Sequence, residues 1–360
     1  MRRARVAAGL GAVLMLLASG VRGDTLATLG AVLPPFIANN FEELVKAAAD
    51  SCDILPLELL FSRRYTSEMP FLDMVEFTRG RTRVYRISAA HQRLLDHPPP
   101  PLLLIYVPGW WNTPTDESSD GLVTALLRKN PIVLAVDTRP IFRRGYIASA
   151  SRVKPLAHLL YSFIRNVHQQ GYPLYSIHVI GFSLGAHVAG MTGKLVQKGL
   201  RGSLGRIIAL DPARPCFMRP SEYRLNRSDA DFVHVVHSSA GVLGLEHPVG
   251  DADIYVNGVS VKQPECRDRS ISLECDHAQA WRLYAASVVN ERSLMGRKCF
   301  SWDQLMSGQC TGNETVVGYS CSANSRGMFL YKSNNGGDIR RTDTQLQVFN
   351  PFDIFSWLRL

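Results

Sequence analysis

Ser183 stands between two glycines, Gly181 and Gly185, each two positions away. The apolar run at residues 177–180 predicts a buried parallel strand before this serine, and the small residues after it predict a helix. A strand that turns sharply into a helix leaves no room for side chains beside the turn, so glycine suits both flanking positions. Such a nucleophile elbow exposes the serine hydroxyl, and the helix N-terminus behind it favours an oxyanion.

A serine hydroxyl is a weak nucleophile unless a histidine accepts its proton and an acid orients that histidine. After a strand–serine–helix turn, the acid and the histidine follow the serine in that order. Asp211 fits the acid because it comes directly after a predicted strand at residues 206–210. An aspartate before a proline is also a common turn former, but the position relative to Ser183 favours the catalytic interpretation.

Ten histidines are available for the role of base. Those inside the strand and the helix around the serine are explained by packing. His237 ends a predicted strand and could border the site. His277 comes later, in a predicted loop before a helical segment at residues 278–289, where the third member of such a triad belongs. Spacing favours His277 over His237 without excluding the latter.

The surrounding sequence alternates apolar strands with helical segments. Strands are predicted at residues 57–64, 83–87, 102–107, 132–137, 206–210 and 232–237, and helices at residues 41–49, 117–129 and 148–169. This alternation predicts an α/β fold with a mostly parallel central sheet and helices on both faces.

Residues 1–23 have the features of a secretory signal peptide, namely a basic start, an apolar run at residues 6–18 and small residues near the end. The run is short for a membrane span, and cleavage after Gly20 or Gly23 fits equally well. We therefore expect a secreted, extracellular protein with one domain over residues 24–360. Sequons at Asn226 and Asn313 predict glycosylation in the same compartment. Seven cysteines predict disulfides and at least one unpaired thiol.

The formal net charge of +9 falls to +5 once the four arginines of the signal peptide are removed. This mildly basic balance is compatible with an anionic surface as partner. The sequence contains no basic-aromatic motif that predicts nucleic-acid binding and no metal-binding motif. Hydrolysis by a serine triad needs no cofactor, and we expect a monomer that requires no protein partner.

Three segments, taken in order, resemble the signatures of the pancreatic lipase family of secreted animal lipases: residues 181–190, 210–217 and 275–277. Residues 229–237 match as well, and the resemblance covers roughly residues 100–330. It implies an α/β-hydrolase fold. It also implies that Ser183 is the nucleophile, Asp211 the orienting acid, and His277 the general base and acid of an acyl-enzyme mechanism.

The resemblance further implies an oxyanion hole formed by the backbone amides of Leu184 and Trp110. In the family the second donor follows a His-Gly pair, whereas this chain has Pro108-Gly109 before Trp110. The loop geometry is therefore expected to differ, although a backbone donor does not need the histidine side chain. Packing in the core or at the rim of the site would also explain Trp110 and Trp111.

Cys266 and Cys275 match the cysteines that close the lid of the family, with only residues 267–274 between them. That segment is short and charged, and a second surface loop at residues 238–250 is also abbreviated. Short versions of both loops resemble phospholipase A1 members, which cleave the sn-1 acyl chain of phospholipids. A short lid could also leave the site open and unselective.

The remaining cysteines are assigned partly by the same resemblance. Cys299 and Cys310 match a disulfide of the family. Cys216 is expected to be a buried free thiol, and Cys52 is expected to pair with Cys321. Larger family members carry a C-terminal β-sandwich, which is not expected within residues 24–360.

The prediction is a secreted carboxylic ester hydrolase, of phospholipase A1 type, that acts on lipid at a membrane or lipid-droplet surface. One alternative is a triacylglycerol or galactolipid lipase. A second is a non-catalytic lipid-binding or yolk-type storage protein, since the family includes such members. A storage protein is expected to lack a triad residue, whereas Ser183, Asp211 and His277 are all present.

Overall fold

The computed structural model describes residues 52, 71–94, 101–143, 145–219, 222–267 and 272–333. The signal peptide, the predicted helix at residues 41–49 and the predicted strand at residues 57–64 lie outside these residues.

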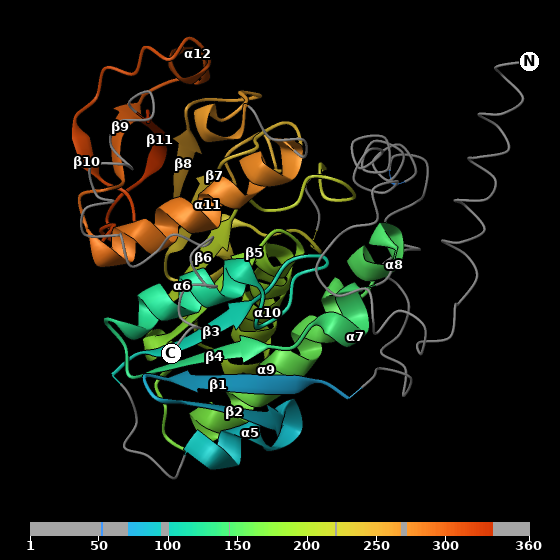
Figure 1. Ribbon diagram of the computed structural model, residues 1–360. Helices are drawn as coiled ribbons and strands as arrows, with labels where there is room; N and C mark the ends of the chain where they lie inside the picture. The colour runs from blue at the N-terminus through green and yellow to red at the C-terminus, as the bar shows by residue number, and fades with distance from the viewer. Residues whose placement is uncertain are drawn as a thin grey trace, which may run out of the picture.

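The described residues contain one sheet of eleven strands in the order β10-β9-β11-β8-β7-β6-β5-β3-β4-β1-β2 (Figure 1). The strands are β1 (Asp73–Thr78), β2 (Arg81–Arg86), β3 (Leu103–Val107), β4 (Ile132–Val136), β5 (Ile177–Phe182), β6 (Arg206–Leu210), β7 (Val233–His237), β8 (Ala252–Val256), β9 (Met295–Cys299), β10 (Glu314–Val316) and β11 (Gly327–Tyr331). Along the sheet, neighbouring strands are parallel from β4 through β3, β5, β6, β7 and β8 to β11. Antiparallel strands extend both edges, β1 and β2 on one side and β9 and β10 on the other.

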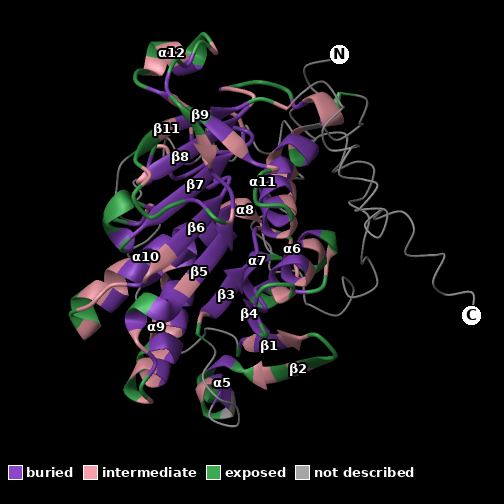
Figure 2. Cartoon of the chain, turned by 90° about the vertical axis from the view of Figure 1, so that its left-hand side faces the viewer, coloured by how far each residue is buried: buried purple, intermediate pink, exposed green. Residues whose placement is uncertain are grey.

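The central strands are apolar because both faces of the sheet are covered. Every residue of β3 and of β4 is buried, as expected for strands that contact helices above and below. One apolar core lies between the sheet and α5 (Ile87–Arg93), α9 (Val153–Gln169) and α10 (Leu184–Leu200). A second lies between the opposite face and α6 (Glu117–Leu127) and α11 (Ser272–Val289). Figure 2 shows the two helical layers on either side of the buried strands, and the predicted fold is confirmed.

The predicted long helix at residues 148–169 is two helices, α8 (Tyr146–Ala150) and α9. Pro155 explains the break, because its ring would clash with the carbonyl of Ser151 in a continuous helix. The hydroxyl of Ser151 and the guanidinium of Arg152 both donate to the carbonyl of Ala148. These side-chain hydrogen bonds compete with the helical pattern and help to end α8.

Among the described residues, no helix combines the length and hydropathy that a bilayer-spanning segment requires.

Candidate active site

The turn from β5 into α10 places Ser183 at the carboxyl edge of the sheet. Ser183 has φ 55° and ψ −119°, a backbone conformation that residues other than glycine rarely adopt. A Cβ atom at Gly181 would lie 2.3 Å from the carbonyl oxygen of Gly185, and one at Gly185 would lie 2.1 Å from that of Val107. The two glycines are therefore required by close backbone contacts around the serine.

Four adjacent strands bring the predicted site residues to this edge. Ser183 follows β5, Asp211 follows β6, and a loop that begins at Ser238 follows β7. The turn after β3 lies against the serine, since a Cβ atom at Gly109 would be 2.9 Å from the Cβ of Ser183. Residues far apart in sequence meet here because the carboxyl ends of neighbouring parallel strands share one edge.

Asp211 and His277 form a direct hydrogen bond, with 2.5 Å between Nδ1 of the histidine and Oδ2 of the aspartate. Asp211 is fully buried, and its Oδ1 accepts hydrogen bonds from the backbone amides of Ser238 (2.8 Å) and Ser239 (3.1 Å). Burial alone would raise the pKa of Asp211, but the hydrogen bond and charge of His277 and the hydrogen bonds from Ser239 hold it below its ordinary value. The carboxylate is therefore ionised and oriented toward the imidazole.

The side chain of Ser239 belongs to the same network, although the sequence did not single it out. Its hydroxyl donates to Oδ2 of Asp211 and lies 3.4 Å from Nδ1 of His277. The amide of Gly244 donates to this hydroxyl at 3.1 Å. The available sequence signal was its position just after a strand that lies beside β6.

Phe182, the last residue of β5, connects the strand that precedes the nucleophile to the base. The ring of Phe182 lies 4.7 Å from the imidazole of His277, centroid to centroid. The hydroxyl of Ser183 makes no hydrogen bond to another described residue. Contacts between nucleophile and base are often long until substrate binds, so this geometry is compatible with a serine that His277 activates.

The two predicted amide donors belong to different segments, α10 and the turn after β3. Leu184 is the first residue of α10, where backbone amides have no carbonyl partner within the helix. Trp110 follows Gly109 in the turn that lies against the serine. The carboxylate of Asp116 fixes the turn, because it accepts hydrogen bonds from the side chain of Asn112 (2.9 Å) and the amide of Thr113 (2.8 Å).

The two tryptophans of this turn differ in exposure. The indole of Trp110 is half-buried and makes an edge contact with Tyr146 at 5.2 Å between ring centroids. Trp111 is exposed and has φ 64°.

His237 does not compete for the role of base. It is fully buried, and its Nε2 binds Oδ1 of Asp253 at 2.9 Å while its Nδ1 lies 3.1 Å from the carbonyl of Leu245. Both ring nitrogens are thus occupied by groups away from Ser183. The alternative assignment of the base to His237 is wrong in this structure.

His187 is buried beneath the site as a packing residue. It stacks on Phe217 at 3.9 Å, donates to the carbonyl of Ala213 at 2.8 Å and accepts from the amide of Leu225 at 3.3 Å. Burial lowers its pKa to about 3, so the imidazole is neutral at neutral pH.

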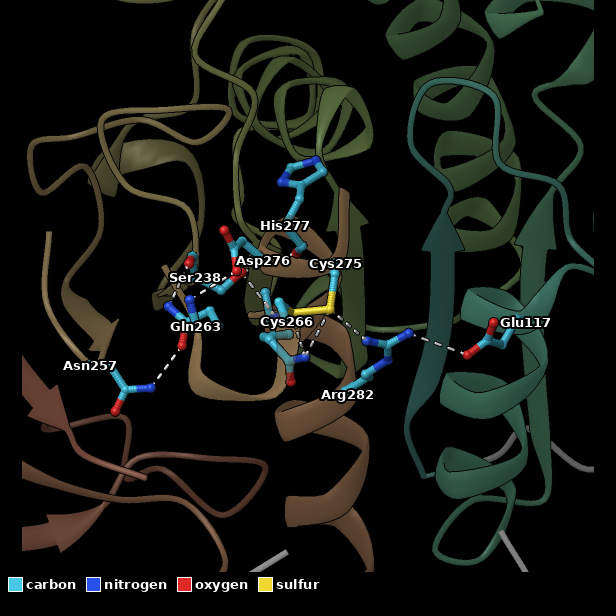
Figure 3. The surroundings of a disulfide bond; sticks show 11 residues. Glu117, Ser238, Asn257, Gln263, Cys266, Cys275, Asp276, His277 and Arg282 are labelled. Carbon is cyan, nitrogen blue, oxygen red and sulfur yellow. Dashed lines mark hydrogen bonds and ion pairs between the residues drawn. A yellow bond between two sulfur atoms is a disulfide. The ribbon is translucent and has the colours of Figure 1, made fainter. Parts of the chain in front are cut away.

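A disulfide joins Cys266 and Cys275 close to the start of α11, and His277 lies two residues beyond it (Figure 3). The sequence placed His277 in a loop, but α11 already begins at Ser272. Cys275 lies within the first turn of α11, so the disulfide ties the start of this helix to Cys266. The base is therefore held on a helix, which is a more rigid element than the predicted loop.

A buried glutamine connects this disulfide segment to the site. The amide of Gln263 donates to Oδ1 of Asp276 at 2.9 Å, and its side chain donates to the carbonyl of Ser238 at 2.8 Å. The hydroxyl of Ser238 in turn donates to the carbonyl of His277 at 3.0 Å. Figure 3 shows Gln263, Ser238 and Asp276 grouped beside His277.

The other disulfides differ in part from the sequence assignment. The structure contains Cys299–Cys310. It also joins Cys52 to Cys216, so the expectations of a free Cys216 and of a Cys52–Cys321 pair were wrong. Cys216 lies in the loop after β6, and Cys52 is bonded to it although the two are 164 residues apart in sequence. Cys321 is the buried free thiol.

Both sequon asparagines, Asn226 and Asn313, are exposed, as glycan attachment requires. Within the described ranges, His, Cys, Asp and Glu side chains form no group of three that could hold a metal ion.

Known proteins match part of this chain. Lipase member H-B of Xenopus laevis is 36% identical over 222 residues, which cover 59% of this chain and 47% of the relative. Phospholipase A1 member A of Pongo abelii is 38% identical over 192 residues, which cover 52% of this chain and 41% of the relative. The chain thus matches about half the length of these relatives, or less.

Among solved structures, an esterase of Pyrobaculum calidifontis is 13% identical with a TM-score of 0.33, covering 71% of this chain and 98% of that one. This likeness is too slight to add to the argument. A family model described as Lipase matches residues 101–335, most of the described chain. The chain therefore belongs to the Lipase family, as its resemblance to pancreatic lipases predicts.

Proposed function

We propose that this protein hydrolyses the carboxylic esters of lipids, with Ser183 as nucleophile, His277 as general base and acid, and Asp211 as the acid that orients the histidine. The observation that carries the proposal is the 2.5 Å bond from Asp211 to Nδ1 of His277 beside a serine in a strained turn. That bond directs the other ring nitrogen, Nε2, away from the carboxylate and makes it available to accept a proton.

The reaction proceeds in two steps. Nε2 of His277 accepts the proton of Ser183 as the serine oxygen attacks the ester carbonyl, and the imidazolium then protonates the leaving alcohol. This leaves an acyl group on Ser183. A water molecule, deprotonated by His277, attacks the acyl group, and collapse of the second intermediate returns the proton to the serine oxygen and releases the fatty acid.

The oxyanion of each intermediate is assigned to the backbone amides of Leu184 and Trp110. Leu184 offers an amide at the first position of α10, where the helix dipole adds partial positive charge. The turn that contains Trp110 lies against Ser183. Asp116 holds this turn by its hydrogen bonds to Asn112 and Thr113, which supports a fixed position for the Trp110 amide.

Ser239 is the other serine close to His277, but its geometry does not suit a nucleophile. Its hydroxyl donates to Asp211 and faces Nδ1, the ring nitrogen that Asp211 already binds. Ser183, at the strained turn before a helix, has the geometry that the reaction requires.

For the substrate we infer phospholipids cleaved at the sn-1 position, with neutral glycerides as the alternative. Support comes from the short segment between Cys266 and Cys275, because a short, charged lid exposes little apolar surface to an oil phase. A relative named phospholipase A1 member A favours the same substrate. Another relative is named lipase member H, so neutral glycerides are kept as the alternative substrate.

We also propose that the protein is secreted and acts as a monomer at a membrane or lipid-droplet surface. Three disulfides support an oxidising compartment. The basic net charge supports attraction to an anionic lipid surface.

The test compares the secreted full chain with Ser183→Ala on a phospholipid and a triglyceride, each labelled in the sn-1 acyl chain. Ser203→Ala is the matched control, since Ser203 lies before β6 at the opposite edge of the sheet. Release of label from phospholipid alone, lost only in Ser183→Ala, is expected. Release mainly from triglyceride would reassign the substrate. Background release by all three proteins would favour the lipid-carrier alternative.

A further inference from the structure

The hydroxyl of Ser239 lies where the acid and the base of the proposed site meet. It donates to Oδ2 of Asp211, the oxygen that also accepts the Nδ1 proton of His277. Its oxygen accepts from the amide of Gly244 at 3.1 Å and faces Nδ1 of His277 at 3.4 Å. A side chain that contacts both members of an acid–base pair affects their orientation and their charge together.

The direction of each hydrogen bond follows from the partners. The amide of Gly244 is a donor, so the serine oxygen accepts there and its own proton points to the carboxylate. The Nδ1 proton of His277 then lies between two oxygens, Oδ2 of Asp211 and Oγ of Ser239.

The main chain of the same residue supports this placement. The amide of Ser239 donates to Oδ1 of Asp211 at 3.1 Å, so one residue binds both carboxylate oxygens. Gly244 leaves the space that this arrangement needs, because a Cβ atom there would lie 2.4 Å from Oδ1 of Asp211.

We propose that Ser239 is a positioning residue that fixes the carboxylate of Asp211 and moderates its attraction for the His277 imidazolium. The inference rests on the proposed function, since it assigns to Ser239 a role in the same reaction. A donor that binds the carboxylate disperses its negative charge, so the imidazolium is stabilised less strongly than by an unbound carboxylate. His277 can then return its proton to the leaving alcohol more readily.

Other titratable groups near the pair are few among the described residues. Glu274 interacts electrostatically with His277, and Asp276 interacts with Asp211. Both belong to α11 and remain in place when Ser239 is changed. A change in the pH profile of a Ser239 variant would therefore report on the hydroxyl itself.

The experiment measures kcat, KM and the pH dependence of kcat/KM for Ser239→Ala and Ser239→Thr on a soluble short-chain ester. Ser239→Ala is expected to lower kcat about tenfold with little change in KM, because the base is less well oriented. The acidic limb of its kcat/KM pH profile is expected to move up by about half a pH unit, because the imidazolium is then more stable. Ser239→Thr keeps the hydroxyl and is expected to restore most of kcat and the original limb.

Ser287→Ala is the matched control for the loss of a buried hydroxyl. Ser287 is also buried in α11, donates to the carbonyl of Tyr284 and accepts from the amide of Tyr319. It is expected to lose stability but to keep kcat and the limb. The proposal is overturned if Ser239→Ala keeps the wild-type kcat and limb, if it loses only what Ser287→Ala loses, or if Ser239→Thr is no better than Ser239→Ala.

Labelling with phenylmethanesulfonyl fluoride separates this inference from the proposed function. Modification mapped to Ser183, together with an unaltered Ser239→Ala profile, would overturn the role of Ser239 alone. Modification mapped to Ser239 would overturn both the nucleophile assignment and the positioning role.

Discussion

The hydroxyl of Ser238 donates a hydrogen bond to the carbonyl oxygen of His277 at 3.0 Å and accepts one from the amide of Ala280 at 3.1 Å. One side chain after β7 thus ties the main chain of the base to the sheet. Ser239, its neighbour in sequence, binds the acid. The loop after β7 therefore holds both partners of the nucleophile, one through its main chain and the other through its carboxylate.

Ser238→Ala is expected to lower kcat by roughly tenfold, because the first turns of α11 lose their attachment near His277. The free energy of unfolding should fall by only about 1 kcal/mol, the usual net effect of one hydrogen bond. Kinetics on a soluble ester and urea unfolding measure the two effects. A loss of stability without any change in kcat would show that Ser238 does not position the base.

Asp211→Asn is expected to lower kcat by about 10⁴-fold, because an amide no longer holds the reactive tautomer of His277. KM on the same ester should change little, because Asp211 is buried and does not line the surface that a substrate contacts. Endpoint assays over long incubation times measure the residual rate. A decrease below tenfold would mean that another acid orients His277.

Gly185→Ala is expected to prevent secretion of a folded protein, since its Cβ would lie 2.1 Å from the carbonyl oxygen of Val107 and 2.8 Å from that of Pro108. Backbone atoms cannot give way as a flexible side chain does, so the cost exceeds the roughly 3 kcal/mol of ordinary overpacking. Gly80→Ala is the control, because no atom lies within 4 Å of its Cβ position. The amount secreted and the thermal midpoint compare the two; normal values for Gly185→Ala would contradict the tight turn.

Titration of buried histidines should reduce stability in mild acid. Burial lowers the pKa of His187 and His234 to about 3, and burial with the nearby charge of Arg206 lowers that of His178 to about 4. The folded state binds these protons less tightly than the unfolded chain. The contribution of these histidines to the free energy of unfolding is therefore fully present above pH 6.5. Below that pH it falls by about 1.4 kcal/mol per pH unit for each histidine.

One carboxyl group opposes this trend. Burial raises the pKa of Asp229 to about 6 despite its ion pair with Lys194. Its folded state binds a proton more tightly than the unfolded chain, so between pH 6 and about 4 it offsets one histidine.

His187→Gln should make urea unfolding less dependent on pH by about one proton; an unchanged slope would show that His187 is not neutral when folded.

The disulfide pattern predicts one free thiol per chain. Thiol titration of the denatured, unreduced protein should find a single reactive group, and peptide mapping should place it at Cys321. Because Cys321 is buried, the folded protein should react slowly. A free thiol at Cys216 would contradict its bond to Cys52.

The sequence predicted the elements with strong local signals and missed those set by distant contacts. The strands β3 and β4 are apolar apart from Tyr106, and β5, β6 and β7 are mostly apolar, so these five strands could be recognised from the local sequence. Edge strand β2 was recognised only in part, because partly exposed arginines obscure its alternation. Strand β8 was missed because Asp253, which is polar and buried beside His237, interrupts its apolar pattern.

The site shows the same division. Ser183 could be predicted because the glycines beside it are a local consequence of the turn. The role of Ser239 depends on the pairing of β6 with β7, which brings it to Asp211. The Cys52–Cys216 bond likewise joins segments 164 residues apart, and no local pattern encodes such a contact.

The Cys266–Cys275 disulfide closes a loop whose two ends are covalently joined beside the base. One end is held by Gln263, which bonds to Asp276 and Ser238, and the other end, Cys275, lies within α11. Residues 267–271, which lie between Cys266 and the first residue of α11, can therefore be exchanged while Glu274 and the first turn of α11 stay unchanged. Substrate preference and turnover should, for this reason, evolve or be redesigned as separable traits.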